Sequence, residues 1–244
     1  MSSELIVSYY KEHESLDCFK EYSEKFNYNI TIYNKSENTN NEHIFKKFNN
    51  FKNKFKIHNL SNIGQATHTY LYHIIENYHN LSDITIFMLG SAFRDSKKKN
   101  KAIWLLKNAN NCKGFSAQHI WMSDVSDFYF ELPYYEIFNY HNNNITENSS
   151  RIKTKMIRAD TIPLGNWIQK NTHYNLENKQ FYRCNKCMFA VTKKVILTKP
   201  LSYYKNLIKQ LELTSRNLEV IHFFERAWIC IFLEPNQNND YYKE

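Results

Sequence analysis

The chain has 244 residues, of which 42% are hydrophobic and 23% are charged. This composition is ordinary for one globular domain, and no apolar run is long enough to span a bilayer. The net charge of +8 fits a polyanionic partner, but the richness in Asn, Lys, Ile and Tyr is typical of an AT-rich genome, which raises the lysine content without a functional demand.

The N-terminus, "MSSELIVSYYKEH", has no basic region followed by an apolar segment, so it does not resemble a signal peptide. We therefore expect a cytoplasmic protein, in the host cytoplasm if the chain is viral. An odd number of cysteines argues against a disulfide framework. Cys184 and Cys187 form a single C-x-x-C, and no second pair completes a zinc site, although His173 could be recruited. We expect plain thiols.

The first ninety residues alternate between strand and helix patterns. Helices are expected at 12–26 and 65–78, the second with a stripe formed by Leu71, Ile74, Ile75 and Tyr78. Strands are expected at 4–10, 28–36, 54–60 and 83–91. Such alternation predicts an α/β fold with a mostly parallel central sheet flanked by helices, of Rossmann-like type.

The rest of the chain is less regular, and residues 110–180 have no assigned role. Residues 95–109 predict a surface helix, and 187–197 a strand followed by a short helix. Pro200 suits the first turn of a helix whose inner face carries Leu201, Tyr204, Ile208 and Leu211. A last helix is expected at 219–232, with its inner face formed by Val220, Phe223, Phe224, Ala227 and Ile231. We expect a single domain over 1–233, a loop insertion at 140–150 and a disordered tail at 234–244.

Several common site motifs are absent. The sequence has no G-x-x-x-x-G-K-[ST], no G-x-G-x-x-G, no H-E-x-x-H and no G-x-S-x-G, which argues against the nucleotidase, dinucleotide, metalloprotease and hydrolase classes that carry them. Polar residues instead follow the predicted strands, where ligands bind in open α/β sheets. The four sets are Ser8–Glu12, Tyr33–Lys35, Asn62–Gly64 and Leu89–Ser91, the last followed by Arg94 and Asp95.

Gly64 opens the helix expected at 65–78. A helix N-terminus with a glycine that admits close approach favours an anion. The alternative is a simple turn in which Asn62 caps the helix.

The polar side of the last helix carries His222, Glu225 and Arg226. His222 and Glu225 are three residues apart and therefore neighbours, so the carboxylate could act as a general base beside the histidine. The alternative is a solvated ion-pair face.

Five blocks together resemble an uncharacterised glycosyltransferase-like family, catalogued as a domain of unknown function, that occurs in bacteria, fungi and large DNA viruses. In chain order they are "IVSYYKE", "IYNKS", "NIGQATHTYLYHIIENYHNLSDITIFMLGS", "CMFAVTKKVILTKPLSYYKNL" and "HFFERAWICIF". The resemblance implies a nucleotide-sugar-binding (GT-A-like) fold and sugar transfer from a nucleotide-sugar donor to a glycan or other hydroxyl acceptor. It implies Glu225 as catalytic base with His222 beside it. Together with the strand-end sets, it predicts donor contacts from Tyr9, Glu12, Asn34, Lys35, Asn62, Gly64, His68, Gly90, Ser91 and Arg94. The donor phosphates would lie near Asn62–Gly64 or be held by Lys35 or Arg94.

The chain departs from the resemblance at two places. Glycosyltransferases of this fold usually carry D-x-D after the strand that here ends in "FMLGS", and the first acid is Asp95, our candidate ligand for a divalent Mn or Mg ion. Asp124 and Asp127 are an alternative acidic pair. Gln65 and Ala66 stand where the family tends to have a basic and an acidic residue. Two other functions stay open: a non-catalytic nucleotide or carbohydrate binder of the same fold, and a nucleic-acid-binding protein, which only the net charge favours.

Overall fold

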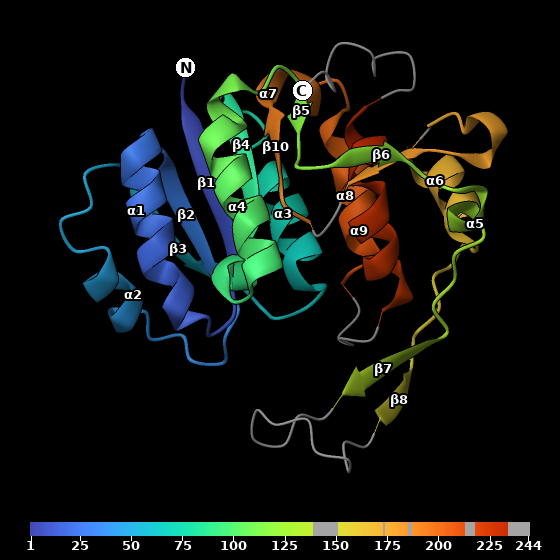
Figure 1. Ribbon diagram of the computed structural model, residues 1–244, viewed down its shortest axis with the longest axis horizontal. Helices are drawn as coiled ribbons and strands as arrows, with labels where there is room; N and C mark the ends of the chain where they lie inside the picture. The colour runs from blue at the N-terminus through green and yellow to red at the C-terminus, as the bar shows by residue number, and fades with distance from the viewer. Residues whose placement is uncertain (139–150, 173, 185–186, 213–217, 234–244) are drawn as a thin grey trace.

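A six-stranded sheet forms the centre of the protein in a computed structural model, which describes residues 1–138, 151–172, 174–184, 187–212 and 218–233 (Figure 1). The strands lie in the order β3-β2-β1-β4-β10-β5. Their bounds are Ser3–Tyr9 (β1), Asn29–Asn34 (β2), Phe55–Asn59 (β3), Ile84–Leu89 (β4), Phe115–Ser116 (β5) and Phe189–Thr192 (β10). The first four are parallel, and β10 runs antiparallel to both β4 and β5. The expected α/β fold with a mostly parallel sheet is confirmed.

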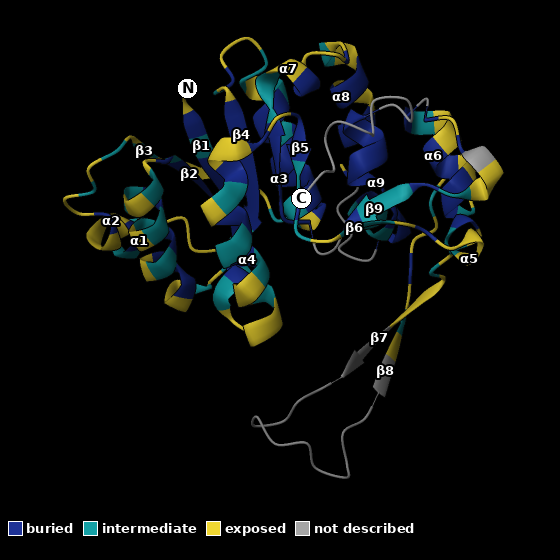
Figure 2. Cartoon of the chain, turned by 45° about the horizontal axis from the view of Figure 1, so that its top comes forward, coloured by how far each residue is buried: buried dark blue, intermediate teal, exposed yellow. Residues whose placement is uncertain are grey.

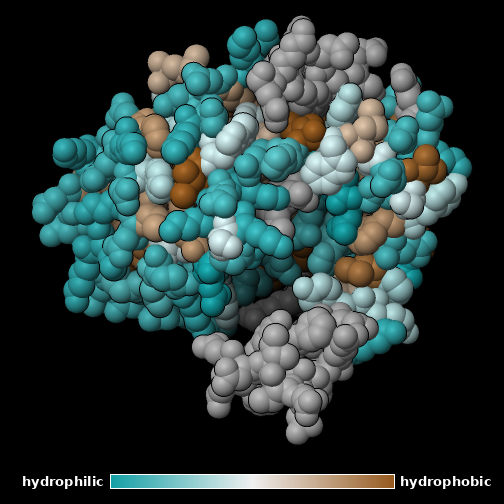
Figure 3. All heavy atoms as spheres, viewed as in Figure 1, coloured by the Kyte–Doolittle hydropathy of each residue, from teal (hydrophilic) through white to brown (hydrophobic). Residues whose placement is uncertain are grey.

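Helices cover both faces of this sheet because side chains alternate along each strand. Leu5 and Val7 of β1 pack into one core with α1 (Leu16–Phe26), α2 (Glu42–Lys47) and α4 (Ser96–Asn108). Ile6 packs into the other core with α3 (Gln65–Glu76), α8 (Leu201–Lys209) and α9 (Glu219–Phe232). Figure 3 shows that the outer surface over α1, α2 and α4 is mainly hydrophilic, as expected for helices that bury only one side.

Helix α9 is buried on most of its circumference and appears almost entirely dark blue in Figure 2. The Trp228 ring lies 5.1 Å from the ring of Phe189 on β10, and it stacks on Phe232 one turn further along α9. Large aromatic side chains of this kind contribute about 1.5–3 kcal/mol each when fully buried. The sequence bounds of α9 and its five inward residues are confirmed.

A smaller region packs beside α9. It contains the two-stranded sheet β6 (Ile120–Met122) and β9 (Tyr182–Cys184), with α5 (Val125–Phe128) and α6 (Leu164–Thr172). A hairpin of β7 (Tyr134–Phe138) and β8 (Arg151–Lys155) projects away from the main body (Figure 1). Short elements complete the chain: η1 (His13–Ser15), η2 (Gly90–Phe93), η3 (Ala109–Asn111), η4 (Glu177–Lys179) and α7 (Lys193–Ile196).

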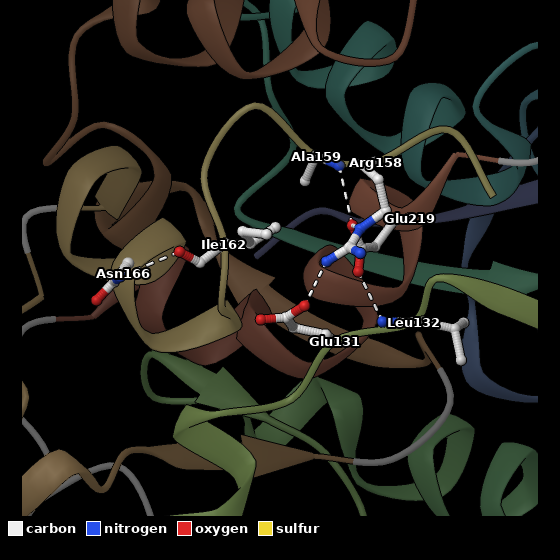
Figure 4. Close-up of polar contacts among 7 residues, drawn as sticks. All are labelled: Glu131, Leu132, Arg158, Ala159, Ile162, Asn166 and Glu219. Carbon is white, nitrogen blue, oxygen red and sulfur yellow. Dashed lines mark hydrogen bonds and ion pairs between the residues drawn. The ribbon is translucent and has the colours of Figure 1, made fainter.

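The Glu219 carboxylate ties the start of α9 to this smaller region (Figure 4). It is fully buried and accepts hydrogen bonds from the backbone N–H of Leu132 at 2.6 Å, the backbone N–H of Ala159 at 3.0 Å and Nε of Arg158 at 2.8 Å. Arg158 also pairs with Glu131. The three hydrogen bonds compensate for the burial of the carboxylate, and they hold the first residue of α9 in place against the smaller region.

Some expected elements differ from those observed. Helix α2 lies between the strands expected at 28–36 and 54–60, where no helix was expected. Pro200 precedes the first residue of α8 as its N-cap, and Leu211 is buried but lies beyond the end of that helix. The proposed insertion at 140–150 and tail at 234–244 lie outside the described residues. No helix in the described ranges combines the length and apolar character needed to cross a bilayer.

Candidate functional site

A pocket of about 360 Å³ lies where the carboxyl ends of β1 and β4 meet. The chain continues from β1 to β2 on one side, whereas β4 pairs with the other side of β1, so the strand order reverses at this point. Such a reversal leaves a crevice, which is the usual ligand site in open α/β sheets. The lining residues are Ser8, Tyr10, Glu12, Lys35, Asn62, Gln65, Ala66, Leu89, Gly90, Ser91 and Glu225. All four strand-end sets of the sequence therefore contribute to one pocket, together with α9.

Glu12 and Gly90 form one wall in close contact. The Glu12 carboxylate accepts a hydrogen bond of 2.5 Å from the backbone N–H of Tyr10. A Cβ at residue 90 would lie 2.5 Å from Glu12 Oε2 and 2.8 Å from the carbonyl oxygen of Ser8, so only glycine fits there without a shift. Burial raises the pKa of the Glu12 carboxyl above its usual value.

Lys35 forms the opposite part of the pocket, just after β2. Its residue is only 3% exposed, and its Nζ donates to the carbonyl oxygens of Ile63 and Gln65 at 2.7 Å each. Burial without a carboxylate partner lowers the pKa of the Lys35 amine to about 7. Because an ammonium has three N–H groups, one donor remains after these two bonds.

Helix α3 begins beside Lys35 in a left-handed turn. Gly64 is the N-cap with φ of 55°, and a Cβ there would lie 2.8 Å from the Cβ atoms of both His68 and Leu211. The alternative in which Asn62 caps this helix is wrong, because the helix begins at Gln65 and no side chain caps it. Asn62 instead lines the pocket.

Glu225 reaches the pocket from α9, with His222 one turn earlier. His222 Nδ1 lies 3.4 Å from Glu225 Oε2, and the His222 ring stacks on Tyr135 of the hairpin at 5.5 Å. The side chains are 17% and 38% exposed, so the pair is neither sealed in the core nor fully solvated. The expected polar side of α9 is confirmed, and the arrangement allows His222 to orient the carboxylate.

The remaining predicted site residues do not line the pocket. Tyr9 points to the opposite face of β1 from Ser8 and Tyr10, because successive residues of a strand alternate. Asn34 bonds to Asn38 and Asn41, and Arg94 pairs with Glu14 at 3.0 Å. Gly64 shapes the pocket only through the backbone.

His68 lies beneath the turn at Gly64 and is nearly buried. Burial, with the Lys35 charge nearby, lowers the pKa of His68 to about 4, so its ring is neutral at pH 7. Within the described ranges its Nδ1 has no hydrogen-bond partner.

The residues at the end of β4 do not fit the metal site implied by D-x-D. Leu89, Gly90 and Ser91 occupy that place. Asp95 lies further on, where its Oδ1 accepts from the backbone N–H of Lys98 at 2.8 Å as the N-cap of α4. Asp127 pairs with Arg183, and Asp124 is exposed at the N-cap position of α5. In the part of the chain that the structure describes, no three His, Cys, Asp or Glu residues are grouped to hold a metal. We therefore derive no step through a metal bound here.

Five of the pocket's lining residues were missed as individual ligands: Ser8, Tyr10, Gln65, Ala66 and Leu89. Strand alternation was the available signal for Ser8 and Tyr10, since both share a face. Ser8 also bonds to Thr69 of α3 at 3.0 Å between hydroxyls. The five cysteines are free thiols, and Cys112, Cys184, Cys187 and Cys230 are buried, in line with the absence of a disulfide framework.

Comparison with known proteins gives one match. A family model described as "Protein of unknown function (DUF3431)" matches residues 23–243, a range that includes β2 to β10 and α9 but begins after β1. No curated protein and no solved structure matches the chain at a significant level. The match confirms the expected membership of a family of unknown function, while sugar transfer stays a prediction.

Proposed function

The chain belongs to the DUF3431 family, and we propose that it is a glycosyltransferase-like enzyme that moves a sugar from a nucleotide-sugar donor to a hydroxyl acceptor. The observation that carries the proposal is that one pocket at the strand-order reversal collects polar side chains from all four strand ends and receives Glu225 from α9. The strand order β3-β2-β1-β4 supports it, since in the classic doubly wound order nucleotides bind at the crevice between the strands in the places of β1 and β4.

The lining chemistry suits a polyhydroxylated ring. Glu12 and Glu225 supply carboxylate acceptors, Asn62 and Gln65 supply amides, and Ser91 supplies a hydroxyl. Hydrogen bonds to ionised groups are roughly twice as strong as neutral ones, and sugar hydroxyls can donate to both carboxylates. Leu89 and Ala66 provide the apolar surface on which a ring can pack.

The leaving phosphate would lie at the Lys35 side. Lys35 is the one cationic side chain among the lining residues, and its remaining N–H can bond an anionic oxygen there. The N-terminus of α3, which begins at Gln65, adds a favourable dipole. Together they replace part of the charge stabilisation that a metal would otherwise give.

In the transfer step, the acceptor hydroxyl oxygen forms a bond to the anomeric carbon. The bond from that carbon to the donor phosphate oxygen breaks, and its electron pair leaves with the nucleoside diphosphate. The hydroxyl proton passes to the Glu225 carboxylate. His222, at 3.4 Å from that carboxylate, is a positioning residue that keeps it aimed at the pocket.

A second function, non-catalytic carbohydrate binding, is favoured by the charges of the lining residues. Two carboxylates face one lysine, so a bare diphosphate meets net repulsion whereas a neutral sugar does not. This alternative needs the same pocket but no base.

A screen of UDP- and GDP-sugars against free monosaccharides separates these functions. Thermal shift with and without manganese measures binding, and release of nucleoside diphosphate measures turnover. The transferase predicts saturable binding of one nucleotide-sugar and its turnover with an added acceptor or water. Binding of free sugars alone would support the second function. A salt-dependent shift with nucleic acid, and none with sugars, would contradict both.

A further inference from the structure

Behind the pocket wall, on the opposite face of β1, three aromatic side chains with metal-ligating atoms meet. The Tyr9 hydroxyl lies 2.7 Å from Nδ1 of His13 and 3.0 Å from Nε2 of His43. The two imidazole rings are in contact, with centroids 4.6 Å apart at 78°. The residues come from β1, η1 and α2, and the fold brings His43, which is 34 residues from Tyr9 in the chain, to the other two.

The separations of the Tyr9 hydroxyl from the two imidazole nitrogens are close to those between ligands of one metal ion. Imidazole nitrogens bind Zn²⁺ at about 2.0–2.1 Å, and ligand atoms of a tetrahedral site therefore lie about 3.3 Å apart. The observed separations of 2.7 Å and 3.0 Å need to widen by only a few tenths of an ångström. Rotation of the exposed His13 side chain can supply that movement.

The electrostatic surroundings favour a cation. The carboxylates of Glu12 and Glu14 lie close enough to the Tyr9 hydroxyl to interact with it electrostatically, and their negative charge attracts a cation. His13 is exposed, which gives an ion a path from solvent.

We propose that Tyr9, His13 and His43 form a binding site for one first-row transition-metal ion of the zinc type, with water as the fourth ligand. The ligand set is two imidazoles and one phenolate oxygen, so it differs from clusters of three His, Cys, Asp or Glu side chains, none of which occurs among the described residues. The ion replaces the phenolic proton, which is released to solvent, and both imidazoles bind as neutral rings. The role of the ion is structural, because its ligands join α2 and η1 to the end of β1.

Binding there would also stiffen the pocket wall. Tyr10 and Glu12 line the pocket and lie between Tyr9 and His13 in the chain. The ion would therefore hold the loop that carries them without touching the sugar. This role does not depend on whether the pocket transfers sugar.

The test uses the full chain, freed of metal with a chelator. Isothermal titration with Zn²⁺ and thermal unfolding with and without Zn²⁺ are compared for wild type, His13→Ala, His43→Ala and the control His79→Ala, whose side chain is exposed elsewhere. Wild type and the control should bind one Zn²⁺ per chain and unfold at a higher temperature with the ion. Each of the two site variants should lose both effects.

Absorption with Cu²⁺ tests the phenol separately. Wild type should show a phenolate-to-copper charge-transfer band and Tyr9→Phe should not, although its two histidines remain. The proposal is overturned if wild type shows no saturable binding, if the site variants bind Zn²⁺ as wild type does, or if Tyr9→Phe keeps both the band and the affinity.

Discussion

The Nζ atom of Lys35 lies 2.7 Å from the carbonyl oxygen of Gln65, 30 residues away in the chain. With a second bond to Ile63, this contact joins the end of β2 to the start of α3. The amine thus holds the backbone at Ile63 and Gln65 in place beside the pocket, and it is also the positively charged group of the pocket. Both roles follow from a lysine that is buried without a carboxylate partner.

Replacing Lys35 by Met should destabilise the protein by about 1–3 kcal/mol, because two buried carbonyl oxygens lose their donor. The pKa of Lys35 is lowered from 10.5 to about 7, so between these values the unfolded chain binds more protons than the folded one. Wild-type stability relative to Lys35→Met should therefore rise with pH over this window. Urea unfolding at pH 6, 8 and 10 measures it, with the exposed Lys46→Met as control. A difference that is constant with pH would contradict the buried, depressed amine.

Anion binding at Lys35 has the opposite pH dependence. Only the protonated amine attracts a phosphate, so the affinity for a nucleotide-sugar should fall by up to tenfold per pH unit above about 7. Titrations at pH 6.5, 7.5 and 8.5 give this slope. An affinity that does not change over that range would mean that the phosphate lies elsewhere.

Gly90→Ala should weaken both folding and ligand binding. The new methyl group would meet the Glu12 carboxylate and the backbone oxygen of Ser8, and such overpacking costs about 1–3 kcal/mol. Chemical unfolding and donor titration measure the two effects. Glu12→Gln is the matched variant, since it changes the carboxylate without adding bulk. Wild-type behaviour of Gly90→Ala would show that the wall is looser than the contacts indicate.

Glu219→Gln should destabilise the protein by about 2–4 kcal/mol, because an amide oxygen cannot accept all three hydrogen bonds that the buried carboxylate accepts. Denaturant unfolding gives the value. The exposed Glu212→Gln, which should stay within about 0.5 kcal/mol of wild type, is the control. Equal stabilities of the two variants would refute the role of Glu219 in fixing α9.

The central sheet and its helices were predictable because each carries its own periodicity. The stripe of Leu71 and Ile74 and the apolar run ending at Leu89 are local signals that the structure confirms. The direction of β10 was not predictable, because a buried strand has the same apolar sequence pattern whether it pairs in a parallel or an antiparallel direction. The hairpin β7–β8 was missed, and Tyr134 and Tyr135, two neighbouring residues of β7, are both exposed instead of alternating between inside and outside.

The site was predictable in outline and less so in detail. Strand ends of a parallel sheet share one edge, so the convergence of Glu12, Lys35, Asn62 and Gly90 followed from topology. Which of two neighbouring side chains points into the pocket depends on the alternation of side chains along the strand. Ser8 and Tyr10 therefore line the pocket, whereas Tyr9 lies on the opposite face. The pairing of Tyr9 with His43 depends on α2, which the sequence did not indicate.

His222→Ala should lower kcat about tenfold or more and leave KM for the donor nearly unchanged, because His222 contacts Glu225 and does not line the pocket. His222→Gln, which keeps a polar group near the carboxylate, should recover part of the rate. Initial rates over a range of donor concentrations separate kcat from KM. A change in KM alone would make His222 a binding residue.

The central claim is that Glu225 accepts the acceptor's proton in the pocket between β1 and β4. The most direct measurement compares wild type with Glu225→Gln for release of nucleoside diphosphate from the nucleotide-sugar that binds, together with its affinity. If Glu225 is the base, the variant should bind the donor with an affinity close to wild type and turn it over about 10²–10⁴-fold more slowly. An unchanged rate in Glu225→Gln would contradict it.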